Sequence, residues 1–282
     1  MRIAVLGGLN LDLLAKPEGN LKLHDSNPGH IRFACGGVGH NAAASLMRLG
    51  YSVRLFTAMG TGAASQLLHA LCAAEGLPIE AVSVSEGNGC TYLCLHEDSG
   101  EMLCAVNDMR AMDAITPEKA LSALSAFSPE ALVLDTNLPQ DTLTAAAKAF
   151  AESIPVFLDP VSTFKASRSL NALPYLTAIK PNRMEALDMT GERSVEKAAE
   201  RLIREGVRYV FISLGAEGVY YADRFRHGIV PALPVDDEVS VTGAGDAMFA
   251  GLIDGILRGM DVETSAQNGC RAAWRQLTNS ED

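Results

Sequence analysis

Short apolar runs alternate with longer amphipathic stretches along most of the chain. The first run, residues 2–6, ends in Gly7 and Gly8. A second run at residues 52–58 follows an Ala- and Leu-rich stretch that residues 36–41 open and Gly50 closes. Apolar runs of four to eight residues between turn residues are typical of buried strands, and the longer stretches have helical spacing. This alternation predicts an α/β fold built on a parallel sheet.

The same rhythm predicts the elements of the rest of the chain. Further strands are predicted at residues 131–135, 155–159, 177–180, 207–213, 218–222 and 227–230. Helices are predicted at residues 64–75, 140–152, 183–189, 195–205, 244–258 and 262–277.

Two segments do not follow this alternation of strand and helix patterns. Residues 90–96 and 101–106 alternate in polarity around residues 98–100, Asp-Ser-Gly, which is a hairpin pattern. With extended residues near 30–33 they form either a small separate sheet, placed as a lid over a site, or an ordinary edge hairpin. Residues 10–33 otherwise look polar and irregular. We expect a single domain over residues 1–282, with lid segments near 11–35 and 88–110.

Charge and hydropathy narrow the class of protein. The 282 residues carry a formal net charge of -11 without a cluster of Lys and Arg, which argues against nucleic-acid polymers as partners. Nucleotides stay possible partners, because backbone N–H groups and Mg²⁺ can hold phosphate. No apolar stretch reaches the ~18 residues of a membrane span, and the first residues lack a secretory pattern. We therefore expect a cytoplasmic protein without a membrane partner.

Six cysteines are spread through the chain, and neither a C-x-x-C pair nor zinc-finger spacing occurs among them. Several lie in apolar, strand-like contexts, where cysteine behaves as a small hydrophobic residue. We expect reduced structural thiols and no metal cluster. The six are Cys35, Cys72, Cys90, Cys94, Cys104 and Cys270.

The strongest local pattern is Thr242, Gly243, Ala244, Gly245 and Asp246, directly before an amphipathic stretch. Small residues at a helix N-terminus let free N–H groups face an anion, so the backbone amides here could form an anion hole. Asp246 would accept the proton of a hydroxyl that attacks a phosphoryl group. The alternative is a helix-capping acid. The local pattern alone leaves the two readings equal.

Two further loops follow predicted strands. Asn182 and Glu185 share one helix face and offer the oxygen ligands that Mg²⁺ prefers, directly or through water. Their alternative role is a helix-capping pair. Ser213, Gly215 and Gly218 would lie against a nucleotide, or form a simple glycine turn. Neither a Walker A sequence nor the protein-kinase motifs occur.

Polar residues near the N-terminus could bind vicinal sugar hydroxyls. Asn10 and Asp12 follow the first strand, and Gly36, Gly37 and Asn41 begin the first long helix. One carboxylate and two amides supply the donors and acceptors that such hydroxyls need. Taken singly, each could equally be a turn residue.

Three motifs in this order resemble those of the ribokinase-like (PfkB) carbohydrate kinase family. They are residues 36–43 (Gly-Gly-Val-Gly-His-Asn-Ala-Ala), residues 182–185 (Asn-Arg-Met-Glu) and residues 242–246. The resemblance covers nearly the whole chain. It implies a three-layer α/β/α sandwich with a mostly parallel central sheet and a small β lid. It also implies an ATP-dependent kinase with a small-molecule nucleoside or sugar as acceptor, and a homodimer formed through the lid.

Within the family, several stretches resemble those of pseudouridine kinases: residues 25–29, 100–103, 106–109, 159–162 and 180–183. This resemblance implies transfer of the γ-phosphoryl group of ATP to the 5′-hydroxyl of pseudouridine. It assigns base catalysis to Asp246, and Asn107 and Asp108 to a surface that reads the base.

The resemblance also implies roles for the remaining candidates. The amides of residues 243–245 would form the anion hole, and Asn182 and Glu185 would organise Mg²⁺ and phosphates. Ser213, Gly215 and Gly218 would border the nucleotide together with Thr242. The ribose would lie against Asn10, Asp12, Gly36, Gly37 and Asn41.

Three departures from the family pattern change these expectations. Ser240 stands where the family often has an Asp associated with a monovalent cation, so potassium activation is not expected. Residues 59–65 lack the acidic residue of the family's G-x-D-x-x-G loop, and the chain ends at Asp282, earlier than is usual. Two alternatives stay open: a kinase for ribose, fructose or uridine, and a binding protein without turnover.

Overall fold

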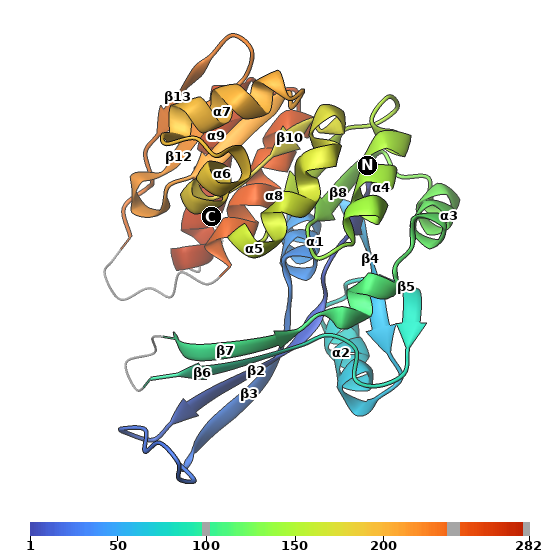
Figure 1. Ribbon diagram of the computed structural model, residues 1–282, viewed down its shortest axis with the longest axis vertical. Coiled ribbons are helices and arrows are strands. Elements are labelled where there is room, and N and C mark those ends of the chain that lie inside the picture. The colour runs from blue at the N-terminus through green and yellow to red at the C-terminus, as the bar shows by residue number, and fades with distance from the viewer. Residues whose placement is uncertain (98–101, 236–242, 279–282) are drawn as a thin grey trace.

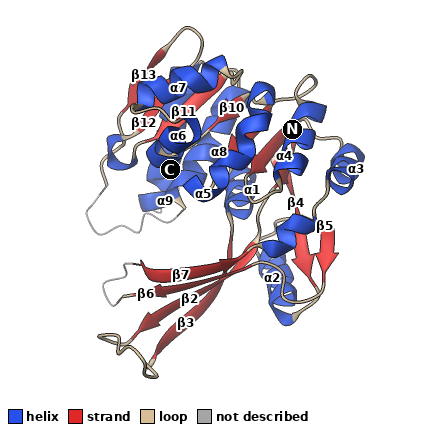
Figure 2. Ribbon diagram, in the orientation of Figure 1, coloured by secondary structure: helices blue, strands red, loops and turns tan. Residues whose placement is uncertain are grey.

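A nine-stranded sheet with helices on both faces forms the body of the protein, and a four-stranded sheet projects below it (Figures 1 and 2). The computed structural model describes residues 1–97, 102–235 and 243–278. The strand order in the large sheet is β13-β12-β11-β10-β9-β8-β1-β4-β5. Its pairs are parallel except β11–β12 and β12–β13, which are antiparallel.

The strands of the large sheet lie close to the predicted positions. They are β1 (Arg2–Leu6), β4 (Ser52–Gly60), β5 (Ile79–Ser85), β8 (Ala131–Asp135), β9 (Val156–Asp159), β10 (Ala178–Ile179), β11 (Tyr209–Ser213), β12 (Val219–Ala222) and β13 (His227–Val230). Only β5 was absent from the prediction.

The helices also match the sequence pattern, with additions. They are α1 (Val38–Arg48), α2 (Ala63–Ala74), α3 (Pro117–Phe127), α4 (Gln140–Phe150), α5 (Thr163–Ala166), α6 (Arg183–Thr190), α7 (Val195–Arg204), α8 (Ala244–Leu257) and α9 (Val262–Thr278). The described residues also include the 3₁₀ helices η1 (Arg110–Ala114), η2 (Ser167–Tyr175) and η3 (Gly215–Glu217). The sequence analysis did not foresee α3, which begins at Pro117 behind the N-cap Thr116.

The two faces of the large sheet bury separate hydrophobic clusters. Along β1, Ala4 and Leu6 face one cluster, with side chains of α3, α4, α6 and α7. Ile3 and Val5 face the other, with side chains of α1, α2, α8 and α9. Successive residues of a strand face opposite sides of the sheet. Because helices cover both sides here, apolar residues occupy every position of such a strand. None of the helices in the described part of the chain is long and apolar enough to cross a membrane.

The prediction that residues 10–33 are irregular was wrong. Asn10–Pro17 forms β2 and Gly29–Gly36 forms β3, which pair antiparallel along their full length. The second sheet, in the order β3-β2-β6-β7, is completed by β6 (Thr91–His96) and β7 (Met102–Asp108). β2 and most of β3 were not recognised because much of this sheet is exposed. Residues 29–33 of β3 and 102–107 of β7 are exposed at every position, so no continuous apolar run is required there. The predicted turn at residues 98–100 lies outside the described residues.

Candidate active site

Four polar side chains meet at the carboxyl-terminal edge of the large sheet. Asp135 ends β8, Asp159 ends β9, and Lys180 directly follows β10. Asp246 lies in the first turn of α8, which packs on one face of the same sheet. Ligands of open α/β sheets bind at this edge, so the topology brings residues from distant parts of the chain to one place.

Asp246 is half-buried, and its Oδ2 accepts a 2.7 Å hydrogen bond from Nδ2 of Asn41. Burial and repulsion from Asp159 raise the pKa of Asp246 to about 7, although Asn41 and Lys180 oppose the rise. The N-cap of α8 is Gly243, in the left-handed region at φ 81°, and the cap carries no side-chain hydrogen bond. Asp246 is therefore not a capping acid, and its carboxylate is directed to Asn41. Ala244 and Gly245 open the helix as predicted.

Lys180 supplies a buried positive charge beside this carboxylate. Its Nζ lies 3.0 Å from Oδ2 of Asp159, and each of these side chains is 7% exposed or less. Burial alone would lower the pKa of Lys180, but Asp159, Asp246 and Glu185 raise it above the ordinary value. The lysine therefore keeps its proton. Its Nζ lies 3.9 Å from the point where a Cβ on Gly245 would stand, at the start of α8.

The sequence analysis missed the roles of Asp135, Asp159 and Lys180. Asp135 is buried and accepts hydrogen bonds from the backbone N–H groups of Gly8 at 2.8 Å and Asn137 at 2.9 Å. Burial raises the pKa of Asp135. One signal was available in the sequence. An acidic residue ends each of two apolar runs, at positions 135 and 159.

The backbone at the end of β9 is strained. Val161 has φ 65°, a conformation that β-branched residues rarely adopt. Its N–H donates a 2.8 Å hydrogen bond to Oδ1 of Asp159. Strain of this kind costs on the order of 1–3 kcal/mol and gathers at functional sites. Asp159 thus binds Lys180 with one oxygen and holds this strained turn with the other.

Asn182 and Glu185 form the capping box of α6. Oδ1 of Asn182 accepts from the N–H of Glu185 at 2.9 Å, and Oε2 of Glu185 accepts from the N–H of Asn182 at 2.8 Å. Oε1 of Glu185 also accepts from Nδ2 of Asn182. The capping alternative therefore describes the geometry. A role of the pair at a metal stays a prediction. Glu185 is buried near Lys180, and burial raises the pKa of Glu185.

The predicted nucleotide residues lie next to this capping box. Ser213 ends β11 and is bridged to Asn182, so both face the same edge of the sheet. Gly215 opens η3 at φ 65°, and Gly218 follows η3 at φ 103°. A Cβ on Gly218 would stand 2.0 Å from the carbonyl oxygen of Val230, so only glycine fits there. Thr242 lies outside the described residues.

The predicted sugar-binding residues meet where the second sheet joins the body. Nδ2 of Asn10 donates a hydrogen bond to Oδ1 of Asp12, and a Cβ on Gly36 would collide with that carboxylate. Burial raises the pKa of Asp12. Gly37 is the N-cap of α1, the helix that carries Asn41. The structure thus brings these residues together, and Asn41 links them to Asp246.

Asn107 and Asp108 diverge because neighbouring residues on a strand face opposite sides. Asn107 pairs with Tyr92, which pairs with Asp12 in turn, so Asn107 belongs to the face that bears Asp12. Asp108 pairs with Thr91, and its carboxylate binds the guanidinium of Arg110. That ion pair lowers the pKa of Asp108 to about 2. Asn107 is therefore better placed than Asp108 to contact a ligand on the face of the second sheet that bears Asp12.

The chain matches the model of the pfkB family of carbohydrate kinases over residues 1–281. It is 34% identical to pseudouridine kinase from Escherichia coli over 99% of this chain and 93% of that protein. It is 26% identical to ribokinase from Bacillus subtilis over 96% of this chain and 91% of that protein. The solved structure of a carbohydrate kinase from Agrobacterium tumefaciens superposes with a TM-score of 0.87 at 28% identity, covering 99% and 91% of the two chains. The chain is therefore a member of the pfkB carbohydrate kinase family, whose members are phosphotransferases that act on hydroxyl groups.

Proposed function

We propose that this kinase transfers the γ-phosphoryl group of ATP to the 5′-hydroxyl of pseudouridine, giving pseudouridine 5′-phosphate and ADP. The observation that carries the reaction type is the placement of Asp246, held by Asn41 and facing the charge of Lys180. Similarity to a pseudouridine kinase over nearly the full chain supports the acceptor. Similarity to ribokinase keeps ribose as the second candidate.

Asp246 would act as the general base. It takes the proton of the 5′-hydroxyl as that oxygen bonds to the γ-phosphorus, while the bond from phosphorus to the β-phosphate oxygen breaks and ADP leaves with the electron pair. Negative charge on the transferring group would face the N–H groups at the start of α8 and the ammonium group of Lys180.

Kinases of this family use ATP with Mg²⁺. In this chain Asn182 and Glu185 would hold the ion through water, because their direct oxygen contacts already form the capping box. Bound Mg²⁺ neutralises phosphate charge. Ser213, Gly215 and Gly218 would border the nucleotide, since the bridge from Ser213 to Asn182 places them on the same side of the site.

The acceptor would lie between the body and the second sheet, which we propose serves as a lid on a single domain. Asn10, Asp12, Gly36, Gly37 and Asn41 would hold the ribose. A cavity of about 420 Å³ lies nearby, bordered by Asn107, Asn137, Phe164 and Lys165 among others. Pseudouridine carries a free N1–H donor that uridine lacks, and amide oxygens in this cavity are suitable acceptors.

Replacing the base tests the mechanism. Asp246→Asn should lower kcat by about 10²–10⁴-fold with little change in KM, because a positioned general base contributes that much. Asp141→Asn is the matched control, since Asp141 is also an acid in the first turn of a helix, α4, and its side chain is exposed. Steady-state ADP release measures both variants. Near-normal turnover of Asp246→Asn would remove Asp246 from the catalytic role.

The raised pKa of Asp246 predicts the pH profile. A carboxyl group with a pKa of about 7 is mostly protonated below that pH and cannot accept a proton, so kcat/KM should rise through pH ~7 and level off above it. The bond from Asn41 lowers the pKa of Asp246, so Asn41→Ala should move the midpoint upward. A profile that stays flat between pH ~5.5 and ~8 would contradict this account.

A panel of acceptors tests the substrate. Pseudouridine should exceed uridine, ribose and fructose by at least ~10-fold in kcat/KM, as expected for one well-placed polar contact. Asn107→Ala should reduce the ratio of pseudouridine to uridine more than it reduces turnover of ribose. A higher kcat/KM with ribose or uridine would reject pseudouridine as the acceptor and leave the assignment of the protein as a kinase unchanged. Acceptor binding without any phosphorylated product would favour a binding protein instead.

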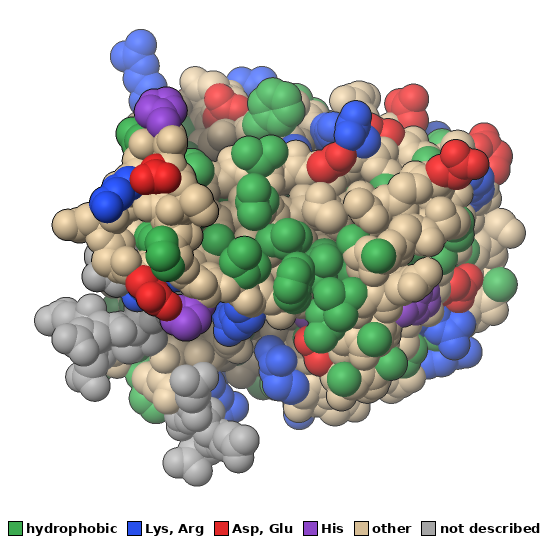
Figure 3. Space-filling model, turned by 90° about the horizontal axis from the view of Figure 1, so that it is seen from below, with side chains coloured by type: hydrophobic (Ala, Val, Ile, Leu, Met, Phe, Trp, Pro, Cys, Tyr) green, Lys and Arg blue, Asp and Glu red, His purple; other side chains and the backbone are tan. Residues whose placement is uncertain are grey.

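We also propose that the protein forms a homodimer through the lower face of the lid. Exposed apolar side chains gather there, including Phe33 and Leu93, each 49% exposed, and Val106, 68% exposed. Figure 3 shows hydrophobic side chains across the middle of the molecule seen from below. Exposed apolar patches of this kind, next to the free edges of a sheet, mark interaction surfaces.

Introducing charge into this patch tests the dimer. Val106→Glu should convert the protein to a monomer, because pairing two such faces would bury uncompensated carboxylates. Ile229→Glu is the control, since Ile229 is 55% exposed on β13, in the large sheet. Sedimentation analysis of the wild type and both variants measures the assembly. A wild type that is monomeric at micromolar concentration would reject the proposal.

A further inference from the structure

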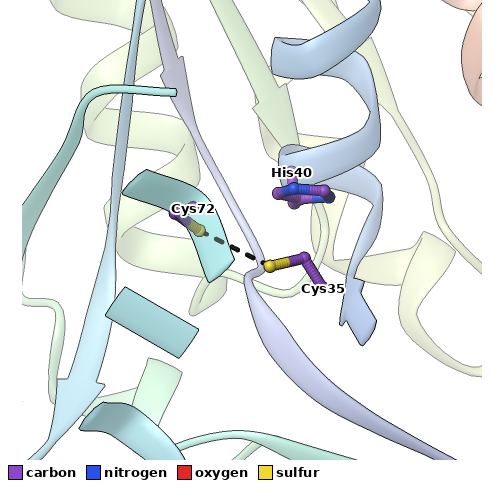
Figure 4. Close-up of side chains that lie close together, drawn as sticks. All are labelled: Cys35, His40 and Cys72. Carbon is purple, nitrogen blue, oxygen red and sulfur yellow. Dashed lines mark hydrogen bonds between the residues drawn. The ribbon is translucent and has the colours of Figure 1, made fainter. Parts of the chain in front are cut away.

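Two cysteines and a histidine from three separate elements meet beside the base of the lid. Cys35 comes from β3, His40 from α1 and Cys72 from α2 (Figure 4). The two Sγ atoms lie 3.7 Å apart. The three potential ligand atoms all lie within 4.8 Å of one another.

We propose that Cys35, His40 and Cys72 form a binding site for a thiophilic divalent cation of the Zn²⁺ type. Zinc takes thiolate and imidazole ligands in tetrahedral geometry, with Zn–S bonds of about 2.3 Å, which places two sulfurs about 3.8 Å apart. The observed separation of the sulfurs already has this value, so the thiolates need little movement to bind the ion.

The charges of this ligand set balance. On binding, each thiol loses its proton to solvent and the imidazole binds through a neutral ring nitrogen, so Zn²⁺ and two thiolates form an uncharged group. Such a group is compatible with the burial of His40 and Cys72. Nε2 of His40 also lies 2.8 Å from Oε2 of Glu75, the C-cap of α2, and Nδ1 lies 3.0 Å from Oδ1 of Asn41. The ion would replace one of these two contacts. A carboxylate near a metal-binding histidine is a common arrangement, because it orients the ring.

The site has an entry path and an open coordination position. A cavity of about 460 Å³ is bordered by Cys35, His40 and Glu75. Asp12, Asn41 and Gly243 of the proposed active site border the same cavity. The ion would enter from this cavity and take a water molecule from it as the fourth ligand. Cys72 closes the site from the α2 side.

The bound ion would join the lid to the body. β3 is an edge strand of the second sheet, whereas α1 and α2 pack against the large sheet. A shared ion restrains these three elements relative to one another and binds only the folded chain, so it should raise the melting temperature. None of the three residues has a direct role in the proposed reaction. The site is nevertheless adjacent to it, because Nδ1 of His40 lies 3.0 Å from Oδ1 of Asn41, the residue that binds Asp246.

Metal analysis tests the site directly. Chelator-treated protein, kept reduced with a phosphine, is loaded with Zn²⁺, passed through gel filtration and analysed for zinc by mass spectrometry. We expect about one ion per chain in the wild type and a higher melting temperature. Loading with Co²⁺ should give the thiolate-to-cobalt charge-transfer absorption expected for sulfur ligands.

Matched cysteine variants separate this site from the other thiols. Cys35→Ser and Cys72→Ser should weaken Zn²⁺ binding by more than ~100-fold, since loss of an outer partner alone costs 10–100-fold. Cys104→Ser and Cys270→Ser should bind as the wild type does; Cys104 is exposed on β7 and Cys270 is buried on α9. Circular dichroism confirms that each variant is folded.

Three outcomes would overturn the proposal. The first is wild-type protein without stoichiometric zinc, and the second is zinc that persists in the folded Cys35→Ser, Cys72→Ser double variant. The third is a disulfide between Cys35 and Cys72 that persists in the phosphine, seen as a mass 2 Da lower with two fewer free thiols. Each of these readouts is independent of the acceptor, so a failure here leaves the proposed kinase reaction untouched.

Discussion

The buried ion pair between Lys180 and Asp159 holds the active-site edge of the sheet together. Asp135, Asp159 and Glu185 are all buried there, and Asp246 is close by. Buried carboxylates without a counter-charge would repel each other strongly or take up protons. Lys180 interacts with three of the four, which lets them share one site. Removing one partner of a buried pair typically costs about 3–5 kcal/mol, so this pair connects stability with function.

The same charges set the chemistry of Asp246. An isolated aspartate would be a weak base near neutral pH, but burial and Asp159 raise its pKa to about 7. Lys180 and Asn41 act in the opposite direction and keep the pKa from rising further. A base is most effective when its pKa lies near the working pH. In the proposed reaction, Asp246 would therefore owe its basicity to Asp159 of β9, Lys180 directly after β10 and Asn41 of α1, and its own helix would supply the position.

Much of the large sheet could be predicted from the sequence, because strands covered on both faces are continuous apolar runs. β2 could not be recognised in this way, since most of its residues are partly or fully exposed and its polar positions resemble a loop. The residues of the site also differ in how far the sequence reveals them. Asn41 and Asp246 carried local motifs, whereas the importance of Asp159 and Lys180 depends on the parallel register of β9 with β10. The cluster of Cys35, His40 and Cys72 gave no spacing signal, because its members lie on three elements.

The capping box of α6 shows why local readings of a motif need not exclude each other. Asn182 and Glu185 satisfy free backbone groups at a helix N-terminus, which is a purely structural task. That task also holds a carboxylate rigidly beside Lys180 and orients α6 with its positive end toward the site. In the role at Mg²⁺ that we propose for Glu185, a flexible glutamate would have to be ordered each time the ion and nucleotide bind, at a cost in conformational entropy. The capping bonds meet that cost during folding, so the alternative readings describe one arrangement.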